Sequence, residues 1–288
     1  MSDLPAGEKR IWLMRPSLRI GAVASLLLLL IGFLSIAWVP YGVESINVGA
    51  AMQDPSGAHW LGTDHLGRDL ISMVMKGMLT SFVVAAVAAA IGALIGLPLG
   101  AAAGAWGGAG DWAILRVNDF LLAFPALIIA ILITAVFGAS AVNIMIAVGI
   151  FNVPFFAHAA REGVLNFKSL NYVDAARLAG MSTADITRRH ILPGMAGLII
   201  AQTVTQLAVG VLAEASLSYV GLGVQSPATS LGLMLRDAQT YALLKPTLAL
   251  IPGLTIVLIV VALNLTADGL REELDPSLRR LGGLRGTA

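Results

Sequence analysis

Long runs without charged residues alternate with short charged segments along this chain. The hydrocarbon core of a bilayer is about 30 Å thick, so a helix needs roughly twenty apolar residues to cross it. Six runs have this length, and FGAS is the natural turn between the third and the fourth. We therefore expect transmembrane helices at about 20–39, 80–105, 115–137, 140–160, 191–213 and 246–267.

This pattern predicts an all-α integral membrane protein with six transmembrane helices. Four basic residues precede the first run, as they would in a secretory signal: Lys9, Arg10, Arg15 and Arg19. The run is longer than the apolar region of a signal peptide, however, and no convincing small-residue cleavage site follows it. We interpret the first run as a retained signal-anchor helix.

Composition agrees with a chain that lies in lipid. Hydrophobic residues make up 57% of the sequence and charged residues 12%, and the mean hydropathy is +0.85. A net charge of +1 gives no basic field for nucleic acid. Because the chain has no cysteine, disulfides, thiol nucleophiles and cysteine metal sites are excluded.

The distribution of lysine and arginine orients the chain, because cytoplasmic connectors are enriched in these residues. With the N-terminus inside, 14 of the 18 basic residues lie in the cytoplasm and four lie outside. This predicts cytoplasmic N- and C-termini, with the segment 1–19, the loop 161–190 and the tail 269–288 inside. Residues 20–268 then form the transmembrane domain.

The chain lacks the motifs of a self-sufficient pump. It has no G-x-x-x-x-G-K-[ST] sequence, the loop that binds nucleotide phosphates in many ATPases. Carriers coupled to ions usually need ionisable groups at mid-membrane, whereas the predicted spans hold only Asp119 and Glu214, at their edges. Two other classes remain open: a secondary carrier or channel that acts alone, and a structural membrane subunit without a path.

The first long connector contains the polar sequence HWLGTDHLGRDLIS, residues 59–72. Four of its side chains are possible metal ligands: His59, Asp64, His65 and Asp69. They lie on a segment interrupted by glycines and lack the i,i+4 or His-x-His spacing of many metal sites. We therefore favour a solvated connector, in which glycine and aspartate form turns, and we assign no metal site.

Four glycines recur at intervals of four in the second predicted span: Gly92, Gly96, Gly100 and Gly104. This spacing allows two helix backbones to approach closely where apolar burial cannot drive their association. The partner is either another helix of this chain or a second subunit.

The segment 170–194 predicts two short helices joined by a sharp turn. Asn171 with Asp174, and Ser182 with Asp185, are spaced as helix-capping pairs. Gly180 supplies the left-handed stop between the helices. Two interpretations remain: a hairpin that rests on lipid headgroups, or a docking element for a soluble partner. The small side chains of Ala175 and Ala176 would allow such a partner to approach closely, whereas Arg188 and Arg189 would favour the lipid.

A family resemblance rests on these residues. The spacing of Asp174-Ala175-Ala176, Gly180 and Leu192-Pro193 resembles the cytoplasmic EAA loop of permease subunits in binding-protein-dependent ABC importers. RHILPG at 189–194 resembles the version found in dipeptide, oligopeptide and nickel permeases. Three further segments agree with that branch: HWLGTDHLGRDLIS at 59–72, EASLSYVGLGVQSP at 214–227 and ADGLREELDP at 267–276. Asp174 replaces the usual glutamate, and Gly194 replaces asparagine.

The resemblance implies the type I ABC importer permease fold, and the chain is similar to the shorter permease of the pair. It implies a non-catalytic subunit of the bacterial inner membrane that imports peptides. The expected partners are a second permease, two cytoplasmic ATPases and an extracytoplasmic solute-binding protein. ATP and magnesium would bind to the ATPases, and this chain would hold no cofactor. The implied coupling residues are Asp174, Ala175, Ala176, Gly180, Arg188, Arg189, Leu192 and Pro193.

Two further sets of residues complete the hypothesis. Gln202 and Gln206 stand one helical turn apart in the fifth span, and Asn152 lies in the fourth. We expect these polar side chains to line the path, although hydrogen bonds between helices are an equal alternative. Arg236 and Asp237 lie in the last outward loop, where we expect contact with the solute-binding protein.

Overall fold

The computed structural model describes residues 16–123 and 125–274, and these form an all-helical protein without a β-strand. The first fifteen residues of the predicted N-terminal segment, and the predicted tail from 275 onward, lie outside the described residues. The long helices are α2 (Pro16–Ala37), α3 (Leu70–Trp106), α4 (Gly108–Ala123), α5 (Ala126–Phe137), α6 (Ala141–Lys168), α10 (Ala196–Val220) and α12 (Thr247–Leu274).

Five of these helices are long and apolar enough to cross a membrane, and α4 with α5 gives a sixth candidate. The predicted span 115–137 is not one straight helix, because the axes of α4 and α5 differ by 80°. The break lies beside Pro125, whose ring lacks the amide hydrogen that would continue the helix. Helix α4 begins at Gly108, so only Gly107 separates it from the end of α3.

The boundaries of other elements differ from the expected ones. Helix α3 begins ten residues before the predicted start and has 37 residues, a length of about 55 Å. It therefore exceeds the thickness of a bilayer core. Its N-terminus is fixed by Asp69, whose side chain accepts a hydrogen bond from the Ser72 amide. Helix α10 continues to Val220, seven residues beyond the predicted end of the fifth span.

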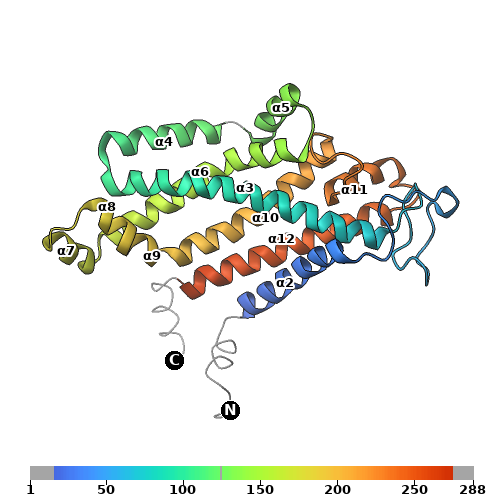
Figure 1. The fold of residues 1–288 in the computed structure, drawn as a ribbon, viewed down its shortest axis with the longest axis horizontal. Coiled ribbons are helices and arrows are strands. Elements are labelled where there is room, and N and C mark those ends of the chain that lie inside the picture. The colour runs from blue at the N-terminus through green and yellow to red at the C-terminus, as the bar shows by residue number, and fades with distance from the viewer. Residues whose placement is uncertain (1–15, 124, 275–288) are drawn as a thin grey trace, which may run out of the picture.

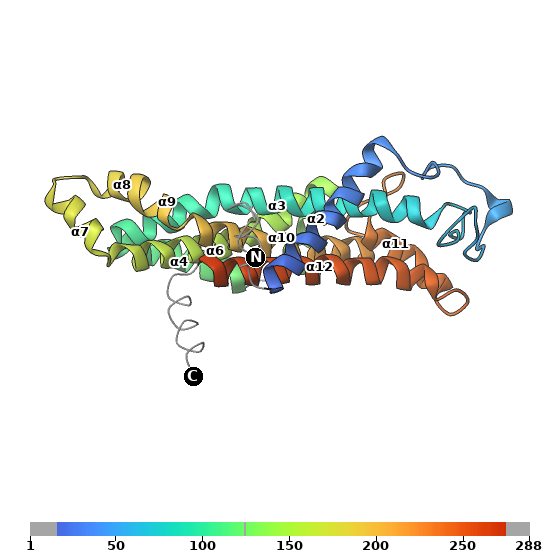
Figure 2. The same cartoon turned by 90° about the horizontal axis from the view of Figure 1, so that it is seen from below.

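The long helices run side by side along the length of the molecule, and short elements collect at the two ends (Figures 1 and 2). One end carries residues 170–194, and we call it the hairpin end. The other carries residues 38–69 together with α11 (Leu231–Ala238), and we call it the loop end. The short 3₁₀ helices Val48–Ala50 and Gln239–Tyr241 also lie in the segments of the loop end.

The four-glycine face of α3 packs against α6 of the same chain. A Cβ atom at Gly92 would lie 2.5 Å from the Asn152 Cβ atom, and one at Gly100 would overlap the Ala157 carbonyl oxygen. A Cβ atom at Gly96 would overlap the Val153 carbonyl oxygen, and one at Gly104 would lie 2.9 Å from the Val164 Cβ atom. The structure therefore decides the alternative left open by the spacing, and the glycines form an interface within the chain.

The four glycines yield a prediction about stability. Gly100→Ala should destabilise the fold by about 1 to 3 kcal/mol, because the methyl group overpacks a backbone contact. Gly110→Ala is the matched control, since Gly110 lies in α4 with no neighbouring atom within 4 Å of its added Cβ. That change should be neutral or stabilise the helix by up to about 1 kcal/mol. Melting temperatures of the two purified variants in detergent measure the difference, and equal shifts would contradict the prediction.

Candidate functional site

The hairpin end consists of four short helical elements. Helix α7 (Asn171–Leu178) is followed by a turn and α8 (Thr183–Ile186), then by a π-helical stretch (Thr187–Ile191) and α9 (Leu192–Gly194). Helix α10 starts two residues later, so the hairpin is joined directly to a long apolar helix (Figure 1).

Gly180 ends α7 in the left-handed conformation that the sequence predicts, with a φ of 81°. The Gly180 amide donates to the Arg177 carbonyl at 2.9 Å, and the Met181 amide donates to the Ala176 carbonyl at 3.2 Å. These two bonds are the pattern of a Schellman motif, which satisfies the last carbonyls of a helix. The turn between α7 and α8 is thus held by backbone bonds that require a positive φ at residue 180.

The predicted capping pairs have different outcomes. Ser182 caps α8, because its hydroxyl accepts from the Asp185 amide at 3.1 Å and donates to the Asp185 carboxylate at 2.6 Å. The cap at the start of α7 is wrong. The residue at that position is Leu170, which offers no side-chain oxygen, and Asn171 is the first helical residue.

A buried apolar cluster attaches the hairpin to the long helices. Val173 of α7, Ile186 of α8 and Ile191 of the π-helical stretch are buried. They pack in one cluster with residues from the adjacent ends of three long helices: Ala101 and Ala105 of α3, Ala160 and Val164 of α6, and Met195 before α10. Lys168 closes the same region, since its ammonium group donates to the Ala105 carbonyl at 2.9 Å. The hairpin can therefore move with the ends of these helices as one packed unit.

The outer face of α7 carries part of the predicted coupling set. Asp174 and Ala175 are exposed, and Asp174 forms an ion pair with Arg177 at 3.1 Å. Ala176 instead packs inward on the buried cluster, so only one of the two alanines lies on the free face. Leu178 shares that face and is 90% exposed. Sequence reasoning missed Leu178, although its i+3 and i+4 spacing from Ala175 and Asp174 would have indicated it.

The remaining members of the coupling set lie after the turn. Arg188 and Arg189 are exposed, and Arg189 approaches Asp185 at 3.8 Å. Leu192 is half-buried against the cluster, and Pro193 lies on the surface of α9. The structure thus brings this predicted set together at one end of the bundle.

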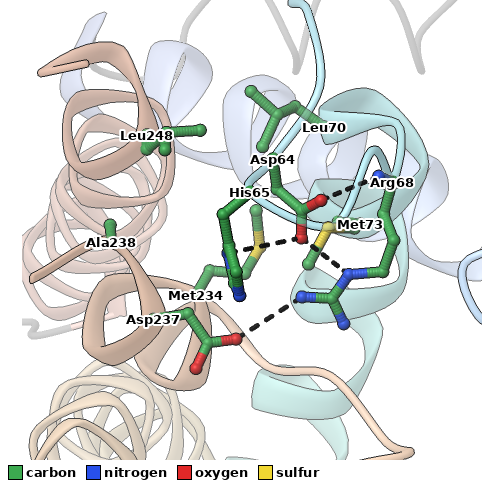
Figure 3. A pocket seen from close by; sticks show the side chains of 9 residues that line it. All are labelled: Asp64, His65, Arg68, Leu70, Met73, Met234, Asp237, Ala238 and Leu248. Atoms are coloured by element: carbon green, nitrogen blue, oxygen red, sulfur yellow. Dashed lines mark hydrogen bonds and ion pairs between the residues drawn. The ribbon is translucent and has the colours of Figure 1, made fainter. Parts of the chain in front are cut away.

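At the loop end, Arg68 joins two segments that are far apart in the sequence (Figure 3). Its Nε atom lies 2.6 Å from the Asp64 carboxylate, and its Nη2 atom lies 3.5 Å from that of Asp237 on α11. The His65 ring stacks on the Tyr241 ring with centroids 5.0 Å apart. These contacts fasten the first connector to the segment between α10 and α12.

The connector 59–72 is more buried than a solvated loop, so that part of the prediction is wrong. Asp64 is 4% exposed and Asp69 is 3% exposed. Asp64 accepts from the backbone amides of Leu66 and Arg68, and Asp69 accepts from Ser72 and lies 3.0 Å from the His59 ring nitrogen. These carboxylates act in turns and caps, as expected. The described residues contain no group of three side chains arranged to hold a metal ion.

The two predicted contact residues on α11 differ in their surroundings. Asp237 is half-buried in its ion pair with Arg68. Arg236 is exposed and lies over Gly221, where a Cβ atom would come within 2.9 Å of its guanidinium carbon. Lys245 donates to the Met52 carbonyl and pairs with the Asp54 carboxylate at 3.1 Å, which adds another contact between the two outer segments.

The three predicted path residues have different surroundings. Asn152 is fully buried against α3, and neither polar atom of its side chain has a hydrogen-bond partner among the described residues. Gln206 is 2% exposed, and its carbonyl oxygen is likewise unpartnered in that part of the chain. Gln202 accepts from Arg271 of α12 at 3.3 Å.

Comparison with known proteins agrees with this architecture. Residues 96–280 match the family model described as "Binding-protein-dependent transport system inner membrane component". The glutathione transport system permease protein GsiD of Pectobacterium atrosepticum is 38% identical over 255 residues, which cover 88% of this chain and 85% of that protein. GsiD of Shigella flexneri serotype 5b is 38% identical over 267 residues, which cover 92% and 88%.

A solved structure is similar in fold. The inward-facing MetNI methionine ABC transporter has a chain that superposes with a TM-score of 0.58 at 17% identity, covering 70% of this chain and 96% of that one. The fold is therefore that of a type I ABC importer permease, a non-catalytic multi-pass component of the inner membrane. Because the family model matches more than half of this chain, the chain belongs to the inner membrane components of binding-protein-dependent transport systems.

Proposed function

We propose that this permease pairs with a second, different permease and moves peptides inward by alternating access, driven by two ATPase subunits that dock on the hairpin end. The observation that carries the proposal is the construction of the hairpin. One face of α7 packs on the ends of three long helices, and the opposite face is free. A displacement of the free face is therefore transmitted to the spans.

The free face of α7 suits a protein partner better than a lipid headgroup. It presents the apolar Leu178 and the small Ala175 beside the carboxylate of Asp174, which an anionic lipid surface would repel. A large exposed side chain on a rigid helix is a typical anchor for a pocket in a partner. Arg188 and Arg189 lie after the turn and leave this face free.

The solute-binding protein is proposed to dock at the loop end. The first connector and the 221–246 segment form one fastened surface there, through Arg68, His65 and Lys245. Arg236 is exposed on that surface and can contact the binding protein directly. Asp237 is half-buried in its ion pair with Arg68 and supports the surface instead.

A peptide is the proposed cargo, because the glutathione transport permeases are similar over most of the chain. The unpartnered side-chain amide of Asn152 and the unpartnered side-chain carbonyl oxygen of Gln206 support a polar path between the helices, since buried polar groups without partners are costly. We propose that these amides become accessible when the path opens at their level, where they match the carbonyl and amide groups of a peptide.

The first prediction concerns the turn of the hairpin. Gly180→Val should recover several-fold less ATPase on co-purification and transport little substrate, because a β-branched residue at this φ costs about 1 to 3 kcal/mol. Gly138→Val is the matched control, since Gly138 also has a positive φ and open space around it but lies between α5 and α6. Full ATPase recovery and uptake with Gly180→Val would contradict the proposal.

Two further variants separate the contact from the turn. Leu178→Ser leaves the backbone intact and should weaken ATPase binding about tenfold, the value of one buried leucine contact. Leu243→Ser, which alters an equally exposed leucine at the loop end, should leave it unchanged. Asp174→Glu restores the side chain usual in relatives and should be tolerated.

The second prediction tests the path and the cargo together. A cysteine at Gln206 in this cysteine-free chain should react with a water-soluble thiol reagent in one nucleotide state of the complete complex and not in the other. A dipeptide without a thiol group, delivered by the binding protein, should slow that reaction, and a free amino acid without a thiol group should not. A cysteine that stays unreactive in both the resting and ATP-trapped complexes would exclude Gln206 from the path.

The third prediction concerns the binding protein. Arg236→Glu should reduce the stimulation of the ATPase by loaded binding protein, because it reverses an exposed charge at the docking surface. The reduction should shrink as salt rises, since exposed charges are screened. ATPase assays at low and high ionic strength measure both effects, and equal stimulation of variant and parent at every salt concentration would argue against docking at Arg236.

A further inference from the structure

Glu214 is a fully buried carboxylic acid within α10, although the sequence placed it at the edge of a span. It forms no ion pair with any lysine or arginine in residues 16–123 and 125–274. Burying such a group is costly unless hydrogen bonds replace the lost water. Its neighbours therefore indicate what holds it there.

Hydroxyl groups from three elements surround the Glu214 carboxyl. Ser81 of α3 donates to Oε2 at 2.6 Å, and Ser218, one turn further along α10, donates to Oε1 at 2.7 Å. The Ser230 hydroxyl, at the N-terminus of α11, lies beside the same carboxyl. All three serines are buried, so the carboxyl and its donors form a closed polar cluster.

Each serine is itself fixed in place. The Ser230 oxygen accepts from the Leu233 amide at 3.2 Å, as a helix cap, which leaves its hydrogen for a second bond. The Ser218 oxygen accepts from the Val224 amide at 3.2 Å in the same way. The carboxyl thus connects α3, α10, the α10–α11 loop and the start of α11 through donors that are already oriented.

The start of α11 packs closely between α3 and α10 beside the Glu214 carboxyl. Its residues Leu231 and Met234 are buried in the cluster that α3, α10 and α12 share. A Cβ atom at Gly232 would overlap the backbone of Ala215, and one at Gly77 would lie 3.2 Å from the Leu231 amide. The start of α11 therefore touches the two helices that the carboxyl connects.

Polar contacts hold α11 at both of its ends. At the C-terminal end, Asp237 pairs with Arg68 at 3.5 Å in a half-buried site near the surface (Figure 3). At the N-terminal end, the bonds of Glu214 are closed to water. Hydrogen bonds are electrostatically stronger where water is excluded, so the N-terminal contact is the better protected of the two.

We propose that Glu214 is a positioning residue that locks the start of α11 to α3 and α10, through its bonds to Ser81 and Ser218 beneath the closely packed start of α11. This inference does not depend on ATPase docking or on the cargo. It assigns a role to the EASLSYVGLG segment, which the coupling hairpin leaves unexplained. Because α10 begins at the hairpin end and carries Glu214 at the loop end, the lock also makes α11 follow any displacement of α10.

The experiment measures how often α11 separates from its groove. Met234→Cys places the chain's only thiol on the buried face of α11, where the parent side chain is 4% exposed. The full chain is kept with its partner subunits in open membrane fragments, and the probe is a water-soluble maleimide. Glu214→Ala risks misfolding, so single serine changes carry the test.

Ser81→Ala and Ser218→Ala should each raise the labelling rate at Cys-substituted Met234 about threefold to tenfold, since each removes one donor to the carboxyl. Ser216→Ala is the matched control. Ser216 lies on the same helix but is exposed and donates to its own helix at the Leu212 carbonyl, so this change should leave the rate unaltered.

A second reporter distinguishes a local lock from general loosening. Ala50→Cys places a thiol at another buried position of the loop end, away from the carboxyl, and its labelling should not change in any serine variant. Equal rates for Ser218→Ala and Ser216→Ala, or equal rises at both reporters, would overturn the proposal.

Discussion

Backbone contact between α3 and α6 is the interaction on which the rest of the structure depends. Within lipid there is no hydrophobic driving force for helices to associate, so close van der Waals packing must supply the attraction. Four glycines on α3 allow this contact over four turns, and the facing residues of α6 fill the space that the missing side chains leave. The two helices form a frame to which the elements of both ends are attached.

The two ends use this frame in different ways. At the hairpin end, small residues of α3 and α6 leave room for the apolar side chains of Val173, Ile186 and Ile191, so the hairpin is fixed by packing. At the loop end, α3 begins at the Asp69 cap, and ion pairs and buried carboxylates fix the connectors. Polar bonds dominate where the chain leaves the apolar layer and backbone groups need other partners.

Function follows from this division. The chain is a non-catalytic inner membrane component of a binding-protein-dependent system, and the proposed alternating access requires it to change shape between its partners. Helix α10 reaches both regions, because the hairpin leads into its start and the buried Glu214 lies near its end. A single rigid helix with a packed joint at one end and a polar joint at the other can transmit displacement across the membrane.

The sequence by itself determined the helical class, the approximate spans and the local turns. Long apolar runs specify helices because lipid leaves no other way to satisfy the backbone. The Gly180 stop and the Ser182 cap depend only on neighbouring residues, and both are present. Tertiary structure alone decided which partner the glycines of α3 meet, why Ala176 turns inward while Leu178 is exposed, and where α4 and α5 separate. It also buried the connector 59–72 and enclosed Glu214, because serines far apart in the sequence can shield a carboxylate only once the helices that carry them are packed.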